Sequence, residues 1–480
     1  MAEGASIVWF RQDLRLEDNP ALTAAVKRGG PIIPVYVWAP EEEEDWAPGA
    51  ASRYWLHHSL KSLEASFEKA GSRLIVRRGN SLEELESVAR SVNAGALFWN
   101  RRYEPAITER DETIKRTFQE RGLEVKSFNG SLLVEPWEVT TKQGSPYKVF
   151  TPFWKACLEQ IDPADPLPVP KTIPAPESWP KYLRIETLEL EPKIDWAEGI
   201  RNTRSFGEDA AHERFEAFLD EWLSDYAEGR DRPDRDGTSM LSPHLHFGEI
   251  GPRQVWHAVQ AAASGHNSPG ARRGAEKFLS ELAWREFSHN LLHNFPHLPH
   301  APMQEKFADF PWADDEEALE AWQRGQTGYP IVDAGMRQLW ETGWMHNRVR
   351  MIVASLLTKD LLISWKHGAR WFWDTLVDAD LANNTQGWQW TAGCGADAAP
   401  YFRIFNPVSQ GERYDPKGDY VRRWVPELAE MPDTWIHKPW EAPKELLAEA
   451  GVKLDETYPL PIIDHSKARE RALAAYDQVK

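Results

Sequence analysis

Cysteine is scarce in this 480-residue chain, and long apolar runs are missing. Two cysteines, Cys157 and Cys394, cannot form a disulfide framework, so we expect a reducing, cytoplasmic setting. The longest apolar runs, such as RMIVASLL, are far shorter than the ~20 residues that span a membrane. No positively charged segment followed by an apolar one precedes the first strand-like run, which argues against secretion.

Motifs of several enzyme classes are missing too. No G-x-G-x-x-G follows the first apolar run, so a dinucleotide site there is not expected. Neither a Walker loop nor a G-x-S-x-G nucleophile motif occurs. Positive charge is in deficit, with 56 Lys and Arg against 74 Asp and Glu, a formal net charge of −18. Such a chain does not coat nucleic acid by bulk electrostatics, although a local basic patch remains compatible with the count.

Tryptophan, in contrast, is abundant, with 24 residues. Indoles stack on flat cofactors and bases, but they also fill cores, and a Trp-rich core explains most of them whatever the function. With 41% hydrophobic and 27% charged residues, the composition is that of ordinary globular domains. The length indicates two or three of them.

The first 132 residues alternate strand-like and helix-like segments. Five short apolar runs, SIVWF, PIIPVYVW, RLIVRRG, GALFWN and EVKSFN, are separated by four amphipathic stretches. This pattern predicts an α/β domain with a Rossmann-like parallel sheet over residues 1–132.

A Pro-rich connector and a helical domain are expected after the sheet. The connector spans 133–202 and carries seven prolines between 161 and 180, too many for a regular ladder. Residues 203–480 predict an all-α domain, because helical periodicity recurs at 207–229, 271–294, 315–325, 331–343, 345–365 and 367–377.

Two polar motifs in the helical part suit a flat, charged ligand. In DGTSMLSPHLHFGEI (236–250) several hydroxyls precede a helix, which suits phosphate binding but also serves simple helix capping. In ELAWREF (281–287) and the next residue, Glu281, Trp284, Arg285 and Ser288 share one helical face. They offer a hydrogen bond, a stacking surface and a phosphate contact, although an Arg–Glu pair covering a core Trp is the alternative.

Two further motifs are dense in arginines, amides and indoles. GWMHNRVRM (343–351) carries arginines that suggest phosphate or carboxylate partners. DADLANNTQGWQW (378–390), taken alone, is also explained by a helix start with Asp caps and a buried Trp. His289 and His293 have i,i+4 spacing but lack a third ligand or an H-E-x-x-H frame, so we expect no metal there.

Taken together, the motifs resemble the photolyase/cryptochrome flavoproteins over essentially the whole chain. The resemblance is carried, in the family's order, by VWFRQDLRLEDNPAL, GTSMLSPHLHFG, ELAWREF, GYPIVDAGMRQLWETGWMHNRVRM, WFWDTLVDADLANNTQGWQW and YFRIFNPVSQGERYDP. It implies a non-covalent FAD in the helical domain, an antenna chromophore in the α/β domain, and blue-light chemistry. The flavin comes from the resemblance alone.

The resemblance also implies roles for individual residues. Flavin contacts fall on Tyr226, Thr238, Ser239, Met240, Leu241, Ser242, Trp284, Arg350, Asp378, Asp380 and Asn384. DNA contacts fall on Arg230, Glu281, Trp284, Arg285, Asn347, Arg348, Met351, Trp390, Arg403 and Gln410. An electron relay runs from Trp388 through Trp365 to Trp312, and the catalytic group consists of Glu281, Asn347, Met351 and Asn384.

Within the family, a few positions indicate the activity. Asn384 stands where photolyases usually carry Asn and plant cryptochromes Asp, which favours repair over signalling. Asn347 favours cyclobutane pyrimidine dimers, because enzymes acting on (6-4) lesions carry a histidine pair where this chain has His346–Asn347. We therefore expect a monomeric, light-driven repair lyase acting on UV-damaged DNA. A cryptochrome-type blue-light receptor is the alternative, and a light-independent flavoprotein is a third.

The antenna is the part that the resemblance defines least. The N-terminal half is similar to plant cryptochromes and their bacterial photolyase sister group, whereas the Cys–Lys pair that enterobacterial enzymes use for folate falls on Leu298 and Pro299. We expect methenyltetrahydrofolate in a different pocket, near Trp55, with a deazaflavin or no antenna as the alternatives.

Overall fold

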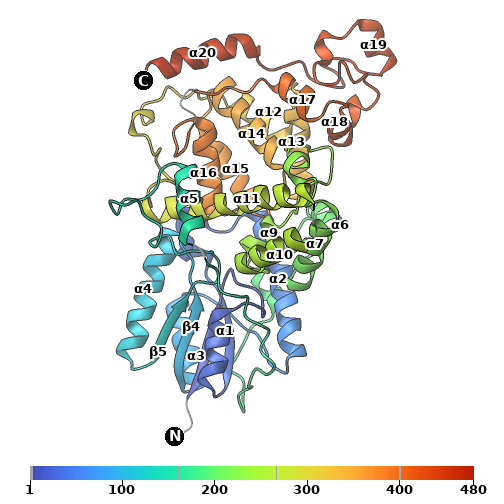
Figure 1. Cartoon of the computed structure of the whole chain (residues 1–480). Coiled ribbons are helices and arrows are strands. Elements are labelled where there is room, and N and C mark those ends of the chain that lie inside the picture. The colour runs from blue at the N-terminus through green and yellow to red at the C-terminus, as the bar shows by residue number, and fades with distance from the viewer. Residues whose placement is uncertain (1–3, 161, 266–267, 399–401) are drawn as a thin grey trace.

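The computed structural model describes residues 4–160, 162–265, 268–398 and 402–480. Ile161 and Tyr401, which belong to the Pro-rich connector and the C-terminal motif, lie outside the described residues. Figure 1 shows a sheet with its helices at the N-terminal end and a helical array stacked above it, towards the C-terminus. The predicted combination of an α/β domain and an all-α domain is confirmed.

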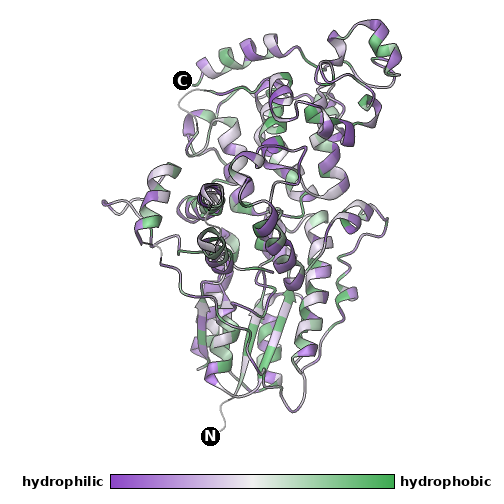
Figure 2. Cartoon of the chain, turned by 45° about the vertical axis from the view of Figure 1, so that its right-hand side comes forward, coloured by the Kyte–Doolittle hydropathy of each residue, from purple (hydrophilic) through white to green (hydrophobic). Residues whose placement is uncertain are grey.

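The α/β domain holds one five-stranded parallel sheet, in the order β3-β2-β1-β4-β5. Its strands are β1 (Ala5–Phe10), β2 (Ile32–Trp38), β3 (Ile75–Arg78), β4 (Ala94–Asn100) and β5 (Glu124–Phe128). The connecting helices are α1 (Pro20–Arg28), α2 (Ala50–Lys69), α3 (Ser81–Ser91) and α4 (Pro105–Glu120). Every residue of β1 and β2 is buried, as expected for strands covered by helices on both faces. Figure 2 shows hydrophobic colour along the strands.

The connector is more structured than its proline content indicates. Within it, helix α5 (Phe150–Gln160) packs on α11, and helix α6 (Glu198–Thr203) packs on α13. Between them the chain runs along the α/β domain, where Pro174 O and Leu167 O accept hydrogen bonds from the backbone N–H groups of Ile32 and Asp18. The segment is therefore attached to both domains.

Helices build the rest of the chain. In order they are α7 (Glu208–Glu221), α8 (Tyr226–Gly229), α9 (Ser242–His246), α10 (Pro252–Gly265), α11 (Pro269–Asn294), α12 (Glu316–Arg324), α13 (Pro330–Thr342), α14 (Asn347–Ser355), α15 (Trp365–Thr375), α16 (Leu381–Ala392), α17 (Pro407–Tyr414), α18 (Asp419–Trp424), α19 (Lys444–Glu449) and α20 (His465–Asp477). None of the helices in the described part of the chain is long and apolar enough to cross a membrane.

One predicted helix is divided. Instead of a single helix over 345–365, α14 ends at Ser355, a π-helical turn covers Leu356–Asp360, and α15 begins at Trp365. Leu362 has a φ of 57°, and the Ser364 side chain accepts a hydrogen bond from Lys366 N–H as the N-cap of α15. The break lets α15 turn back and pack against α16.

Candidate functional site

A cavity of about 540 Å³ lies between α8, α9 and α11 on one side and α14, α15 and α16 on the other. It brings together residues far apart in the sequence, from Tyr226 of α8 to Trp390 of α16. The predicted site residues that line it are Tyr226, Arg230, Ser239, Leu241, Ser242, Glu281, Trp284, Arg285, Asn347, Arg348, Arg350, Met351, Asp378, Asp380, Asn384, Trp388 and Trp390.

Arg204 and Arg214 contact the turn that precedes α9. Arg214 donates to the carbonyl oxygens of Ser239 and Thr238, at 3.0 Å each, and Met240 has a φ of 53° with its sulfur 3.2 Å from Arg204 Nη1. Ser239 and Ser242 consequently line the cavity, whereas Thr238 and Met240 do not.

The polar face of α11 is confirmed, because Glu281, Trp284, Arg285 and Ser288 all line the cavity. Glu281 pairs with two cations, Arg230 at the C-terminal end of α8 and Lys277 one turn earlier on α11, the latter at 3.1 Å. The sequence reasoning missed Lys277, although its i,i+4 spacing from Glu281 is a local signal that points to such a pair.

Helix α14 has His346 as its N-cap, and its first polar residues line the cavity. His346 Nδ1 accepts a hydrogen bond from Arg348 N–H at 3.2 Å, and burial lowers the pKa of His346 to about 4. Arg348 Nη2 lies 2.9 Å from Asp231 Oδ1. The helix therefore begins beside a neutral imidazole and presents Asn347 and Arg348 at the cavity.

The expected ion pair between Arg350 and Asp378 is present, with Nη2 and Oδ2 2.8 Å apart. Arg350 Nε also donates to Met345 O at 2.8 Å. The other carboxylate oxygen of Asp378 is buried and has no hydrogen-bond partner among the described residues. A buried acceptor in that state needs a donor, so it points to a ligand in the cavity.

Asp380 begins α16 and faces two histidines. Its Oδ1 accepts from Asn383 N–H at 2.8 Å, while Oδ2 lies 3.5 Å from His289 Nε2 and 3.9 Å from His246 Nδ1. Burial alone would raise the pKa of Asp380, but the histidines and nearby Arg285 bring it well below its usual range. The carboxylate is therefore charged at the edge of the cavity.

Asn384, one turn further along α16, lines the cavity and donates its amide to Ala369 O at 3.0 Å. That contact fixes which end of the side chain faces α15. His289 and His293 do not converge on one point: His289 faces Asp380 and Arg285 O, and the ring of His293 packs on Trp137.

Of the three predicted relay residues, only Trp388 lines the cavity. Trp365 is 2% exposed and Trp312 partly buried in the same hydrophobic cluster. The rings in contact with Trp388 are Phe372 and Trp322, with centroids 5.0 and 6.1 Å away, rather than Trp365. Nothing in the sequence singles out these two from the other aromatic residues.

Two predicted DNA contacts lie outside the cavity. Arg403 is exposed just before α17, and Gln410 lies within α17, where its N–H donates to Asn406 O. Neither residue lines the cavity that holds the other predicted DNA contacts.

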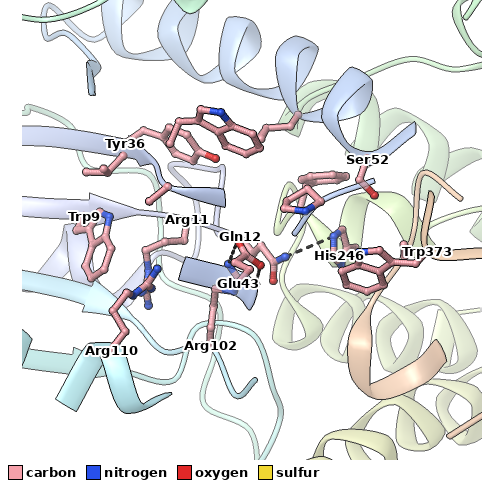
Figure 3. Close-up of a pocket in the computed structure, with 17 residues that line it drawn as sticks. Trp9, Arg11, Gln12, Tyr36, Glu43, Ser52, Arg102, Arg110, His246 and Trp373 are labelled. Carbon is pink, nitrogen blue, oxygen red and sulfur yellow. Dashed lines mark hydrogen bonds and ion pairs between the residues drawn. The ribbon is translucent and has the colours of Figure 1, made fainter. Parts of the chain in front are cut away.

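A second, small cavity lies at the carboxyl ends of β1 and β2. Its volume is about 40 Å³, enough for a few waters but not for a pterin or flavin ring. Figure 3 shows Trp9, Arg11 and Arg110 on one side of it and His246 and Trp373 on the other. Trp55 is 1% exposed and does not line this cavity.

Comparison with known proteins identifies the family. Residues 6–174 match the family described as DNA photolyase, and residues 278–478 match the FAD binding domain of DNA photolyase. The chain is 51% identical over 475 residues to the deoxyribodipyrimidine photo-lyase of Agrobacterium fabrum, covering 99% of this chain and 98% of that protein. It is 42% identical to Cryptochrome-1 of Arabidopsis thaliana, over 99% of this chain and 70% of the cryptochrome. A crystal structure of a bacterial class III photolyase from Agrobacterium tumefaciens matches with a TM-score of 0.95 and 51% identity, covering 100% and 98% of the two chains.

The matched FAD-binding region contains α14, α15, α16 and most of α11, which form much of the cavity wall. Fold and cavity together therefore define an FAD-binding protein with an α/β domain attached. The chain belongs to the photolyase/cryptochrome family.

Proposed function

We propose that the protein is a light-driven DNA repair lyase that splits cyclobutane pyrimidine dimers. One observation carries the proposal: in a chain 51% identical to a photo-lyase, a single cavity holds the acid, amide and indole groups that a flipped dimer requires together with those that suit a flavin. The activity named for the Agrobacterium fabrum relative is the activity proposed here.

The residues of the cavity fit FAD. Its volume of about 540 Å³ is in the range of cofactor sites, and the buried, unpartnered oxygen of Asp378 offers an acceptor to the ring. The hydroxyls of Ser239 and Ser242 would hold the pyrophosphate, and Arg350 would stay beside the ring with Asp378 as its counter-ion. Bound FAD would supply light absorption and the electron that opens the cyclobutane ring.

Photolyases are among the enzymes that flip the target nucleotide out of the duplex. In this chain Trp284 and Trp390 would pack against the flipped-out dimer. Asn347 and Glu281 would hydrogen-bond the edges of its bases, and Met351 would fill the space beside them. The Asn347 amide can donate to a base carbonyl oxygen and would stabilise the negative charge that develops there, whereas the Glu281 carboxylate, paired with Arg230 and Lys277, would accept from a base N–H.

Cations gather at the cavity on an otherwise acidic chain. Arg230, Lys277, Arg285 and Arg348 all line it. We infer that they hold the phosphates that flank the lesion, with Arg403 and Gln410 further along the same DNA. A local basic mouth of this kind accounts for DNA binding by a chain with a net charge of −18.

Electron supply and the antenna complete the proposal. Trp388 would donate the electron that reduces oxidised flavin; Trp365 would then return an electron to the oxidised Trp388, and Trp312 one to Trp365. For the antenna we propose methenyltetrahydrofolate on the α/β domain, on the basis of family membership. The small cavity of Figure 3, at about 40 Å³, is too small for such a ring as the structure stands.

The second candidate function is that of a cryptochrome-type receptor, favoured by the 42% identity to Cryptochrome-1 of Arabidopsis thaliana. Asn384 argues for repair, since a neutral amide places no charge beside the ring.

Repair of a defined oligonucleotide tests the choice. The purified holoenzyme, reduced and illuminated, should restore an oligonucleotide with one cyclobutane dimer, but not in the dark and not one with a (6-4) lesion. Normal flavin content without any repair of the cyclobutane dimer would contradict the photolyase assignment. The absorption spectrum of the same sample shows whether a folate is bound.

A further inference from the structure

The two indole walls of the cavity are held from outside by one short segment of the chain. Phe150, the first residue of α5, stacks on Trp284 with ring centroids 3.8 Å apart and an interplanar angle of 7°. Trp284 lines the cavity and Phe150 does not. One face of this indole is therefore occupied by a parallel ring that the ligand does not reach.

The second wall is attached to the same segment through Asp397. The indole Nε1 of Trp390 donates to Asp397 O at 3.1 Å, and Asp397 N–H donates to Lys148 O at 3.1 Å. The backbone amide of Phe150 faces the carboxylate of Asp397 and opposes the rise in the pKa of Asp397 that burial causes. Residues 148–150 thus contact the support of Trp390 and stack on Trp284 at the same time.

Both supporting residues are constrained. Phe150 is 8% exposed and belongs to a hydrophobic cluster with Phe153 and Phe287, which attaches α5 to α11. Asp397 has a φ of 51°, a left-handed conformation that costs free energy for a residue other than glycine. Such strain persists only where surrounding contacts hold it, and it is concentrated at functional sites.

We propose that Phe150 and Asp397 are positioning residues that set the separation and tilt of Trp284 and Trp390, and with them the preference of the cavity for a dimer over undamaged bases. The inference rests on the proposed function. Stacking on an indole contributes only when the rings are parallel and in contact, so a wall that is free to tilt loses part of the contact with a flipped dimer.

Dark binding by the holoenzyme tests this for the first wall. The probes are an oligonucleotide with one cyclobutane dimer and its undamaged counterpart. For Phe150→Leu we expect the Kd for the dimer to rise about tenfold, because the flat support of Trp284 is lost. Binding of undamaged DNA should stay unchanged, and repair per photon at saturating substrate should stay within about twofold of wild type. Phe150→Tyr keeps the ring and should restore dimer binding.

A neighbouring residue provides the matched control. Phe153 is 1% exposed, lies on the same helix and packs on Phe287, but its ring does not stack on Trp284 in the described part of the chain. Phe153→Leu should lower the melting temperature about as much as Phe150→Leu does, while the Kd for the dimer stays that of wild type. Flavin absorbance is measured for every variant, so a loss of cofactor is separated from a loss of wall geometry.

The second wall is tested at Asp397. Asp397→Asn keeps an acceptor for the Phe150 N–H, and Asp397→Gly removes it while relieving the left-handed backbone. We expect the glycine variant to bind the dimer several-fold more weakly and the asparagine variant to bind it as wild type does.

The inference is overturned if Phe150→Leu and Asp397→Gly bind the dimer as tightly as wild type, or if Phe153→Leu weakens dimer binding as much as Phe150→Leu. A wild-type holoenzyme that does not distinguish the dimer from undamaged DNA contradicts the proposed function as well. A wild type that does so, with variants that match it, contradicts this inference alone.

Discussion

Protonation of His346 should destabilise the protein in mildly acidic solution. The side chain is 3% exposed, and its Nδ1 must be unprotonated to accept the Arg348 N–H that caps α14. Burial lowers the pKa of His346 from 6.5 to about 4, with Arg230, Arg348 and Arg350 adding to the effect and Asp231 opposing it. Native His346 therefore stays neutral at a pH where the unfolded chain binds a proton, so stability falls as the pH drops from 6.5 towards 4.

The size of the effect follows from the two pKa values. A tenfold difference in proton affinity corresponds to about 1.4 kcal/mol, so this residue removes about 2 kcal/mol between pH 7.5 and pH 5, and about 3 kcal/mol by pH 4. His346→Asn should lack this loss, because asparagine caps helices well and does not titrate.

Denaturant unfolding of the two holoenzymes at pH 7.5, 6 and 5 measures the difference. The free energy of unfolding of wild type should fall relative to that of His346→Asn by about 2 kcal/mol over this range. Other titrating groups are common to both proteins and cancel in the difference. Parallel stability curves for the two proteins would refute the assignment of a neutral, capping imidazole.

Three further outcomes test the cavity. Trp388→Phe should abolish photoreduction of oxidised flavin, followed by absorbance, while chemically reduced enzyme still repairs; photoreduction at the wild-type rate would place the first donor elsewhere. Gly368→Ala should displace the Trp388 ring, since a Cβ there would lie 2.0 Å from it, and we expect the free energy of unfolding to fall by about 1–3 kcal/mol in a denaturant titration. Asp378→Asn should weaken FAD binding to the apoprotein about tenfold in a fluorescence titration, because Arg350 loses a charged partner worth roughly 1.5–3 kcal/mol.

The fold was predictable where local pattern and burial coincide. Strands covered on both faces are continuous apolar runs, so the five strands of the sheet could be read directly. The break between α14 and α15 could not, since apolar residues continue through LLTKDLLISW without a change of period. The local signal there was Ser364 as an N-cap. Helix α5 ends at Gln160, just before the proline-dense residues 161–180, and was missed because all of 133–202 was assigned to the connector.

The site, too, has features that local spacing predicts and others that depend on tertiary packing. The shared face of Glu281, Trp284 and Arg285 follows from helical spacing and was predicted from it. The meeting of α11 with α14 and α16 depends on packing between distant segments, and no spacing in the sequence encodes it. The prediction that these helices form one site came from the family resemblance. Supports such as Phe150 and Asp397 lie one layer behind the cavity and carry no motif.

The stretch DADLANNTQGWQW shows why a structural explanation and a functional one need not compete. Asp380 does cap a helix, since its Oδ1 accepts from the backbone and side-chain amides of Asn383. A carboxylate has room for about four hydrogen bonds, and its second oxygen faces His289 and His246 at the cavity. One oxygen of Asp378 likewise pairs with Arg350, while the other has no hydrogen-bond partner among the described residues. Each acid therefore uses one oxygen for the helix cap or an ion pair and leaves the other for the cavity, so helix capping and a role at the site apply to this stretch together.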